Sequence, residues 1–191
     1  MMTQPLTPAA GLVDAEMREL LLAAIPALRA FAFSLTYDLD RSDDLVQDTL
    51  VRAWTKADSF RRGTNLTAWL FTILRNLFYS EQRKRKREIE DADGAHAARL
   101  SSLPEQEIRV EMGEFRVALD RLPYSQREAL ILVGAQNFTY EEAAAICGVA
   151  VGTVKSRVSR ARGRLIEALG MQGTDDIGAD GLTRAALGGA P

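Results

Sequence analysis

The chain has 191 residues, 47% of them hydrophobic, and a formal net charge of −2 at neutral pH. This length suits one larger domain or two small ones, and the charge excludes a protein that coats nucleic acid with its whole surface. One cysteine (Cys147) and one histidine (His96) exclude an intramolecular disulfide and the usual zinc sites, so we expect no metal and no cofactor. We find no apolar run of membrane-spanning length and no secretory leader, and therefore expect a cytoplasmic protein.

The charges are unevenly placed along the chain. Residues 83–87 read Arg-Lys-Arg-Lys-Arg, whereas five aspartates lie between positions 38 and 48. Such an asymmetry suggests different partners for different surfaces.

Three helices are predicted in the first half of the chain. The first spans about residues 15–35, where apolar residues recur at helical spacing and Pro26 favours a kink. The second spans about residues 42–56, with Ser42 as its N-cap and Asp43 and Asp44 in its first turn. The third spans about residues 64–87 and has a wide apolar face.

The pattern changes after this helix. Residues 89–107 are polar and lack helical periodicity, which indicates a flexible linker. Helical pattern returns from 108 to 122, Pro123 breaks it, and Ser125 with Glu128 predicts a capping box for the next helix. We therefore expect an all-α fold of two small helical domains, 14–88 and 108–169, between disordered tails at 1–13 and 170–191.

Residues 139–165 have the pattern of a helix-turn-helix. Thr139 and Glu142 form a capping box, and Gly148 lies where the chain must reverse. The second helix carries five basic residues and no acid before Glu167. Such a helix can lie in the major groove of duplex DNA, although a solvated basic helix on an ordinary bundle would share part of this pattern.

The third helix has features that suit single-stranded DNA. Trp69, Asn76 and Phe78 precede its basic run, and Phe60 lies just before the helix. Bases stack on aromatic rings, an amide can read a base edge, and cations follow the phosphates. Taken singly, Trp69 and Phe78 fit a hydrophobic core equally well, and Asn76 could simply be exposed.

Three blocks of the sequence together resemble bacterial extracytoplasmic-function (ECF) sigma factors. Residues 44–54 (Asp-Leu-Val-Gln-Asp-Thr-Leu-Val-Arg-Ala-Trp) resemble the segment that docks on the clamp helices of RNA polymerase. Residues 58–61 and 67–76 resemble the promoter-melting helix. Leu122-Pro123, 140–145 and 151–162 resemble the distal helix-turn-helix, so the resemblance covers about residues 14–169.

The resemblance implies roles for individual residues, with 14–88 as sigma domain 2 and 108–169 as sigma domain 4. Core polymerase would bind Asp44, Gln47, Asp48 and Arg52. Phe60 and Asn76 would form the pocket for a flipped base of the −10 element. From their aromatic and basic character, we expect the same melted strand to contact Trp69, Arg83, Lys84, Arg85, Lys86 and Arg87. The −35 duplex would contact Lys155, Ser156, Ser159, Arg160 and Tyr140, with Arg157, Arg162 and Arg164 on phosphates.

One subgroup is most similar. Residues 71–76 (Phe-Thr-Ile-Leu-Arg-Asn) with the following basic run resemble the general-stress (EcfG-type) sigma factors of alphaproteobacteria. That resemblance implies a small helical anti-sigma factor of the NepR type and a GGAAC-like −35 sequence. Ala150 departs from the wider family, in which many members carry Ser or Pro, so side-chain capping of the recognition helix is not expected there.

Other functions remain as alternatives. A stand-alone helix-turn-helix regulator would leave the acidic segment unexplained. A sigma-like decoy would bind an anti-sigma factor but not promoters. An enzyme is disfavoured because we find no nucleophile beside a base and no phosphate-binding loop, and we expect no small-molecule substrate and no membrane partner.

Overall fold

The computed structural model describes residues 10–61, 63–92 and 113–170, and every regular element in these ranges is helical. The N-terminal half contains α1 (Ala10–Thr36), α2 (Leu39–Thr55), the 3-10 turn η1 (Ala57–Ser59) and α3 (Leu66–Ala92). The C-terminal half contains α4 (Gly113–Asp120), α5 (Tyr124–Gly134), α6 (Tyr140–Cys147) and α7 (Val151–Leu169). The expected all-α class is confirmed. Most of the expected tails and of the expected linker lies outside the described residues, but α1 begins at Ala10, inside the expected N-terminal tail, and α3 extends to Ala92, inside the expected linker.

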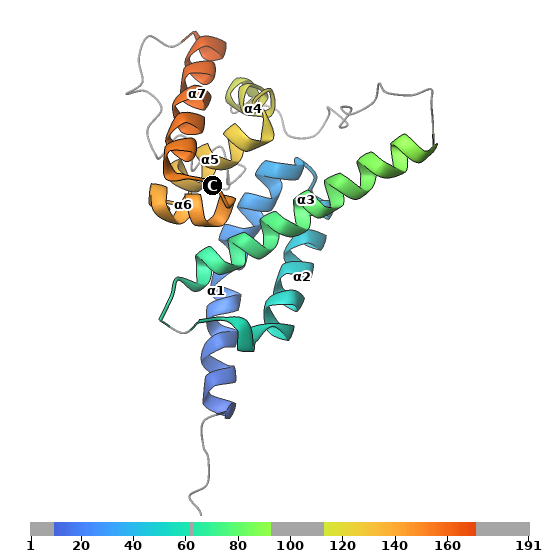
Figure 1. Cartoon of the computed structure of the whole chain (residues 1–191), viewed down its shortest axis with the longest axis vertical. Helices are drawn as coiled ribbons and strands as arrows, with labels where there is room; N and C mark the ends of the chain where they lie inside the picture. Colours follow the sequence, from blue (N-terminus) through green and yellow to red (C-terminus); the bar gives the residue numbers. More distant parts are fainter. Residues whose placement is uncertain (1–9, 62, 93–112, 171–191) are drawn as a thin grey trace, which may run out of the picture.

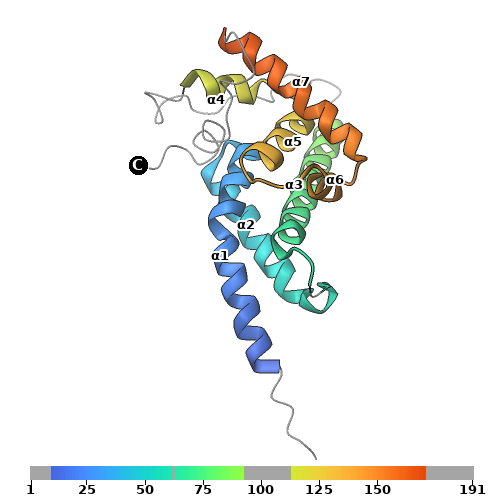
Figure 2. The same ribbon diagram turned by 90° about the vertical axis from the view of Figure 1, so that its left-hand side faces the viewer.

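The two halves lie directly against each other. Figure 1 places α5 between α7 and the upper end of α1, with α6 beside α3, and Figure 2 shows the same order from the side. One hydrophobic core contains buried residues from both halves. At its centre the ring of Phe71 stacks on Phe31 at 4.9 Å and meets Phe138 edge-on at 5.0 Å. The aromatic contacts therefore join α1, α3 and the C-terminal half in one core.

The long first helix is a core helix. α1 continues through Pro26 without a break in its helical assignment. We predicted no apolar run of membrane-spanning length, but Met17–Thr36 is long and apolar enough to cross a membrane, judged by length and composition alone. Its inner face packs in the protein, because Leu28, Phe31 and Leu35 are buried. Core helices of ordinary globular proteins meet the same length and composition criteria.

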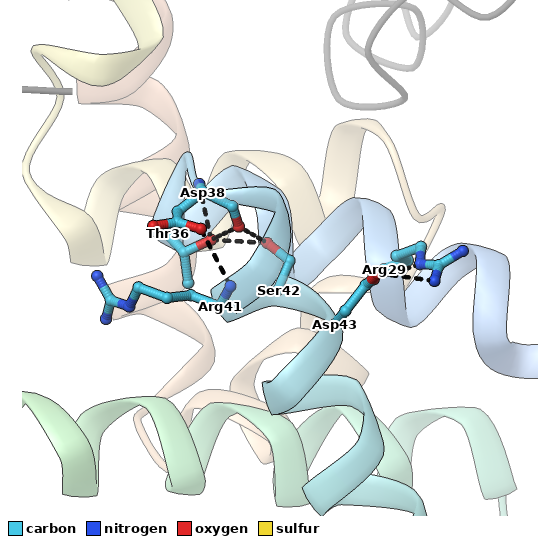
Figure 3. A network of polar contacts seen from close by, with 6 residues as sticks. All are labelled: Arg29, Thr36, Asp38, Arg41, Ser42 and Asp43. Carbon is cyan, nitrogen blue, oxygen red and sulfur yellow. Dashed lines mark hydrogen bonds and ion pairs between the residues drawn. The ribbon is translucent and has the colours of Figure 1, made fainter. Parts of the chain in front are cut away.

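The start of α2 corrects the predicted N-cap. Asp38, not Ser42, caps the helix, and its carboxylate accepts a hydrogen bond from the Arg41 amide at 3.0 Å. Ser42 is buried inside the helix, where its hydroxyl bonds the Asp38 carbonyl and lies 2.7 Å from the Thr36 hydroxyl (Figure 3). Tyr37 has a positive φ of 52°, so the chain reverses one residue before Asp38 and the helix begins earlier than predicted.

Three further predictions about helix ends are wrong. Asp43 and Asp44 lie beyond the first turn of α2, and Asp43 pairs with Arg29 of α1 (Figure 3). The Ser125–Glu128 capping box does not form, because α5 begins at Tyr124 with Pro123 as its N-cap and no side-chain cap. Glu128 is fully buried and contacts α3 instead. α3 also continues past the predicted Arg87, to Ala92.

Candidate nucleic-acid interface

The helix-turn-helix is built as the sequence predicts. The Thr139 hydroxyl accepts from the Glu142 amide at 3.1 Å, and the Glu142 carboxylate accepts from the Thr139 amide at 2.9 Å, so both halves of the capping box are present. Gly148 ends α6 in the left-handed conformation with a φ of 65°. Ala150 precedes α7 without a side-chain cap. These local signals set the angle at which α7 leaves the turn.

α7 has one buried and one exposed face. Val154, Val158, Ala161 and Leu165 are buried, which orients the rest of the helix toward solvent. Lys155, Ser159, Arg160 and Arg164 are exposed, and Ser156, Arg157 and Arg162 are half-buried along the border. Tyr140 is half-buried beside the helix, and the Lys155 ammonium lies 5.7 Å from the centre of its ring. All eight predicted −35 residues therefore lie on α7 or against it.

The predicted −10 residues lie along α3 and the turn before it. The ring of Phe60 lies 5.2 Å from that of Trp69, and both side chains are half-buried. Asn76 is exposed and follows Trp69 by seven residues, which places both on the same side of the helix. Phe78 is fully buried, so for this residue the core interpretation is right.

The basic run occupies the far end of α3. Its five side chains, Arg83, Lys84, Arg85, Lys86 and Arg87, are exposed. Figure 1 shows this end of the helix extending away from the other helices. A projecting cationic helix end can attract phosphates without displacing any core contact.

The outer face of α2 carries the predicted polymerase-binding residues. Asp44, Gln47, Asp48 and Arg52 are all exposed, at spacings of three and four residues. The opposite face contributes Leu45, Val46, Thr49 and Ala53 to the core, and these are buried. The face is thus polar, with acids at one end and Arg52 at the other.

An apolar groove beside this face was missed by the sequence analysis. A cavity of about 330 Å³ lies between α1 and α2, and Trp54 and Val51 line it although they are 49% and 57% exposed. The groove is lined by Arg18, Leu21, Leu22, Leu50, Val51, Trp54 and Thr55. One signal in the sequence could have indicated this groove. Trp54 directly follows the buried Ala53, so its large aromatic side chain leaves the helix away from the core.

Glu128 forms a buried polar cluster between the two halves. Its Oε1 lies 2.6 Å from Arg75 Nε, and its Oε2 accepts from the Tyr79 hydroxyl at 3.3 Å. Burial raises the pKa of Glu128, and the neighbouring Arg75 opposes that shift. Burial also raises the pKa of Tyr79 and, aided by the Glu128 charge, raises the pKa of Cys147 to about 12.

Arg127, which precedes Glu128 in α5, makes a second polar contact between the halves. It is 3% exposed and donates to the Ser34 carbonyl near the end of α1 at 3.2 Å. Its other amino group donates to the carbonyls of Asp120 and Leu122, at 2.8 and 3.2 Å. The guanidinium also lies over the ring of Tyr37, at 4.7 Å. A single cation therefore bonds to the carbonyl of the last residue of α4, to a carbonyl just beyond α4, and to one near the end of α1.

The comparisons with known proteins identify the family. The chain matches Sigma-70 region 2 over residues 20–88 and Sigma-70, region 4 over residues 112–165. It is 61% identical over 173 residues to the ECF RNA polymerase sigma factor EcfG of Rhodopseudomonas palustris, covering 91% of this chain and 96% of that relative. The chain belongs to the ECF RNA polymerase sigma factors.

Other sigma factors are similar in sequence and in structure. The ECF sigma factor SigM of Bacillus subtilis is 32% identical, covering 76% of this chain and 90% of that protein. The sigma factor RpoE, in its complex with the anti-sigma factor NepR from Bartonella quintana, superposes with a TM-score of 0.72. It is 54% identical, covering 83% of this sigma factor and 99% of that chain. CnrH bound to the cytosolic domain of CnrY gives a TM-score of 0.56 at 25% identity, covering 86% of this chain and 92% of that one.

Proposed function

We propose that this sigma factor directs core RNA polymerase to general-stress promoters by reading two DNA elements with its two halves. One observation carries the proposal. This chain, a member of the ECF sigma factors, has a capped helix-turn-helix that presents Lys155, Ser159 and Arg160 on the exposed face of α7. The general-stress role is supported by the 61% identity to EcfG. The protein acts through binding, as a transcription initiation factor.

In this proposal α7 lies in the major groove of the −35 element. Lys155, Ser156, Ser159 and Arg160 contact base edges, while Tyr140 positions Lys155 by packing under its ammonium. Arg157, Arg162 and Arg164 contact phosphates on either side of the groove. The phosphate contacts supply affinity that falls with salt, and the base contacts supply the preference for a sequence.

The −10 element binds to the N-terminal half as a melted strand. Phe60 and Trp69 provide stacking surfaces, and the amide of Asn76 reads the edge of a flipped base. The strand then continues along α3, where Arg83, Lys84, Arg85, Lys86 and Arg87 accompany its phosphates. Unstacking one base costs a few kcal/mol, and stacking on the two rings offsets that cost.

Core polymerase docks on α2 through its clamp helices. Asp44, Gln47, Asp48 and Arg52 form the polar part of this contact, and the groove with Val51 and Trp54 supplies apolar area beside it. An apolar centre with a charged rim is the usual composition of a specific protein interface. We infer a cytoplasmic location because transcription by bacterial polymerase takes place there.

A small anti-sigma factor of the NepR type is the proposed inhibitor. The support is the similarity to RpoE, which was solved in complex with NepR. A regulator of this kind would bind the free sigma factor and release it under stress.

Transcription in vitro tests the proposal. Core polymerase with the purified chain is expected to start at a promoter with a GGAAC-like −35 sequence, and Asn76→Ala is expected to spare −35 duplex binding while reducing permanganate reactivity of the melted strand. A chain that binds an anti-sigma factor but never supports the start of transcription would be a decoy. A chain that binds duplex DNA without binding core polymerase would be a stand-alone regulator.

A further inference from the structure

Two glycines of α7 lie at positions where neither the backbone nor the packing requires a glycine. Gly152 is in the first turn of the helix, Gly163 is in its second half, and both are exposed. Among the described residues, a Cβ atom on either would meet no heavy atom within 4 Å beyond the nearby backbone of the helix, and neither has a positive φ. Gly148 and Gly170, by contrast, end α6 and α7 in the left-handed conformation.

Glycine at these two positions lowers the stability of α7. After proline it is the poorest helix former, because its backbone loses the most conformational freedom on folding. Alanine would fit the open space at either position and would favour the helix. Substitutions that would stabilise a protein are commonly absent where they would impair function, and glycine suits sites where a ligand approaches the backbone closely. The two glycines therefore suggest a partner that contacts this side of α7.

The two glycines lie on one side of the helix, opposite its buried face. They are 11 residues apart. That separation is about three turns and a rise of about 17 Å along the axis. Ser156 and Ser159 fall between them on the same side, and the Ser156 hydroxyl is held close to the helix because it donates to the Thr153 carbonyl at 2.9 Å. Small side chains therefore leave the backbone of α7 accessible to an approaching surface over this length.

Cations border this side of α7 on both flanks. At 3.6 residues per turn, Lys155 and Arg162 lie on one flank. Arg160 and Arg164 lie on the other flank, and both are exposed. This profile matches the major groove of B-DNA, which is about 12 Å wide and has base edges at its floor and phosphates along its walls. A helix with its side chains is about 10–12 Å across, so the side chains at its leading edge decide how deeply it enters the groove.

Two arginines of α7 carry donors that lack an acceptor. Arg157 Nη1 and Arg162 Nε are buried and have no hydrogen-bond partner in the part of the chain that the structure describes. A buried N–H group without an acceptor costs free energy, and hydrogen bonds from a guanidinium to a phosphate are strong. Both side chains therefore gain by turning toward an anion beside α7. This observation is independent of the glycines and indicates the same partner, a polyanionic duplex.

We propose that Gly152 and Gly163 set the depth at which α7 enters the major groove of the −35 element, and that they thereby determine how well the helix discriminates between sequences. Because neither glycine has a Cβ atom, the backbone of α7 comes close to the floor of the groove. This depth brings Ser159 and Arg160 within reach of base edges. The inference rests on the proposed promoter function and adds two specificity-determining residues to it.

Alanine substitution separates stability from recognition. Gly163→Ala is expected to raise the melting temperature by about 2–4 °C, and Gly152→Ala to raise it by less, because alanine favours the helix. Each variant is expected to bind a GGAAC-like −35 duplex about tenfold more weakly, because the added methyl group lies between the helix and the base edges. Binding to a scrambled duplex depends on phosphate contacts and should change by less than about twofold. Fluorescence anisotropy with the full chain measures both dissociation constants.

Gly113→Ala is the matched control, because Gly113 is an exposed glycine of α4 with the same open space for a Cβ atom. This variant should bind both duplexes as the wild type does. The proposal is refuted if Gly152→Ala or Gly163→Ala binds the −35 duplex as tightly as the wild type, or if both duplexes are weakened equally.

Transcription with core polymerase distinguishes a protein partner from DNA. If Gly163→Ala binds the −35 duplex normally but no longer supports transcription, Gly163 faces the polymerase and the proposal is overturned. Failure of the wild type to prefer the −35 duplex to the scrambled one would instead overturn the proposed function.

Discussion

Glu142 takes part in a helix cap and in a contact between the halves. Its carboxylate accepts hydrogen bonds from the Thr139 amide and from Asn65, and these two bonds lower its pKa. A carboxyl whose pKa is lowered by folding contributes stability above its unfolded pKa of about 4.3. That contribution is lost as the pH falls through the lower, folded pKa.

We therefore expect acid to weaken the cap in the wild type but not in Glu142→Gln. Urea denaturation at pH 6 and at pH 3 should show a larger loss of unfolding free energy for the wild type, because the side-chain amide of the variant does not titrate. Glu141→Gln, at the neighbouring exposed position, is the control and should behave as the wild type. Equal pH dependence of the wild type and Glu142→Gln would contradict the assignment.

Arg160 is the residue on which the base-reading role of α7 can be tested. Arg160→Ala is expected to weaken binding to a −35 duplex by about 1–3 kcal/mol if the side chain contacts a base, with little effect on a scrambled duplex. Arg164→Ala is the matched comparison at an exposed position one turn further along. It is expected to weaken both duplexes equally and to reduce the salt slope by about 0.9. Fluorescence anisotropy at several salt concentrations measures both effects.

At the scale of the helix, prediction from sequence succeeded where one segment contains all its signals. Three features of the helix-turn-helix depend only on neighbouring residues, and all three were predicted correctly. They are the capping box of Thr139 and Glu142, the reversal at Gly148 and the missing side-chain cap at Ala150. Ser42 and Ser125 were wrongly assigned as N-caps. Seen without its surroundings, a serine followed directly by aspartates, or by a glutamate three residues later, resembles the start of a helix. Asp38 supplied an earlier cap for α2, and Arg75 pairs with the glutamate that Ser125 would have needed.

The exposed face of α2 gives a prediction of its own. Asp48→Arg is expected to abolish co-elution with core polymerase while the helix content stays the same, because Asp48 is exposed and its backbone lies opposite the buried face. Asp58→Arg makes the same charge change at an exposed position beyond α2 and should still co-elute. If Asp48→Arg also co-elutes, the acidic face is not the docking surface.

At the scale of the whole molecule, the contact between the halves was beyond sequence prediction. Arg75 and Glu128 are 53 residues apart, Asn65 and Glu142 77, and Ser34 and Arg127 93. No periodicity within one helix indicates which distant residue will pair with it. The polar stretch between the halves correctly suggested two units, but it gave no sign that they share a core.

Cys147 can report on this shared core. Its thiol is buried and its pKa is raised to about 12, so at pH 8 very little of the reactive thiolate is present. We expect slow reaction with a thiol reagent in the wild type and clearly faster reaction in Arg75→Met, because loss of the ion-pair partner of Glu128 loosens the packing between α3 and α5 beside Cys147. Arg121→Met serves as the control, and labelling followed by mass spectrometry gives the rates. Equal rates in all three proteins would mean that Cys147 stays covered when Arg75 is lost.

The joint packing of Phe31, Phe71 and Phe138 has a consequence for genetics. Alleles that impair strand opening need not map to the melting helix, since a change at Phe138 displaces the rings of α1 and α3 that support it. Second-site suppressors of such alleles should then fall in α1 or α3. A defect observed at one promoter element will therefore not reveal which half of the gene carries the mutation.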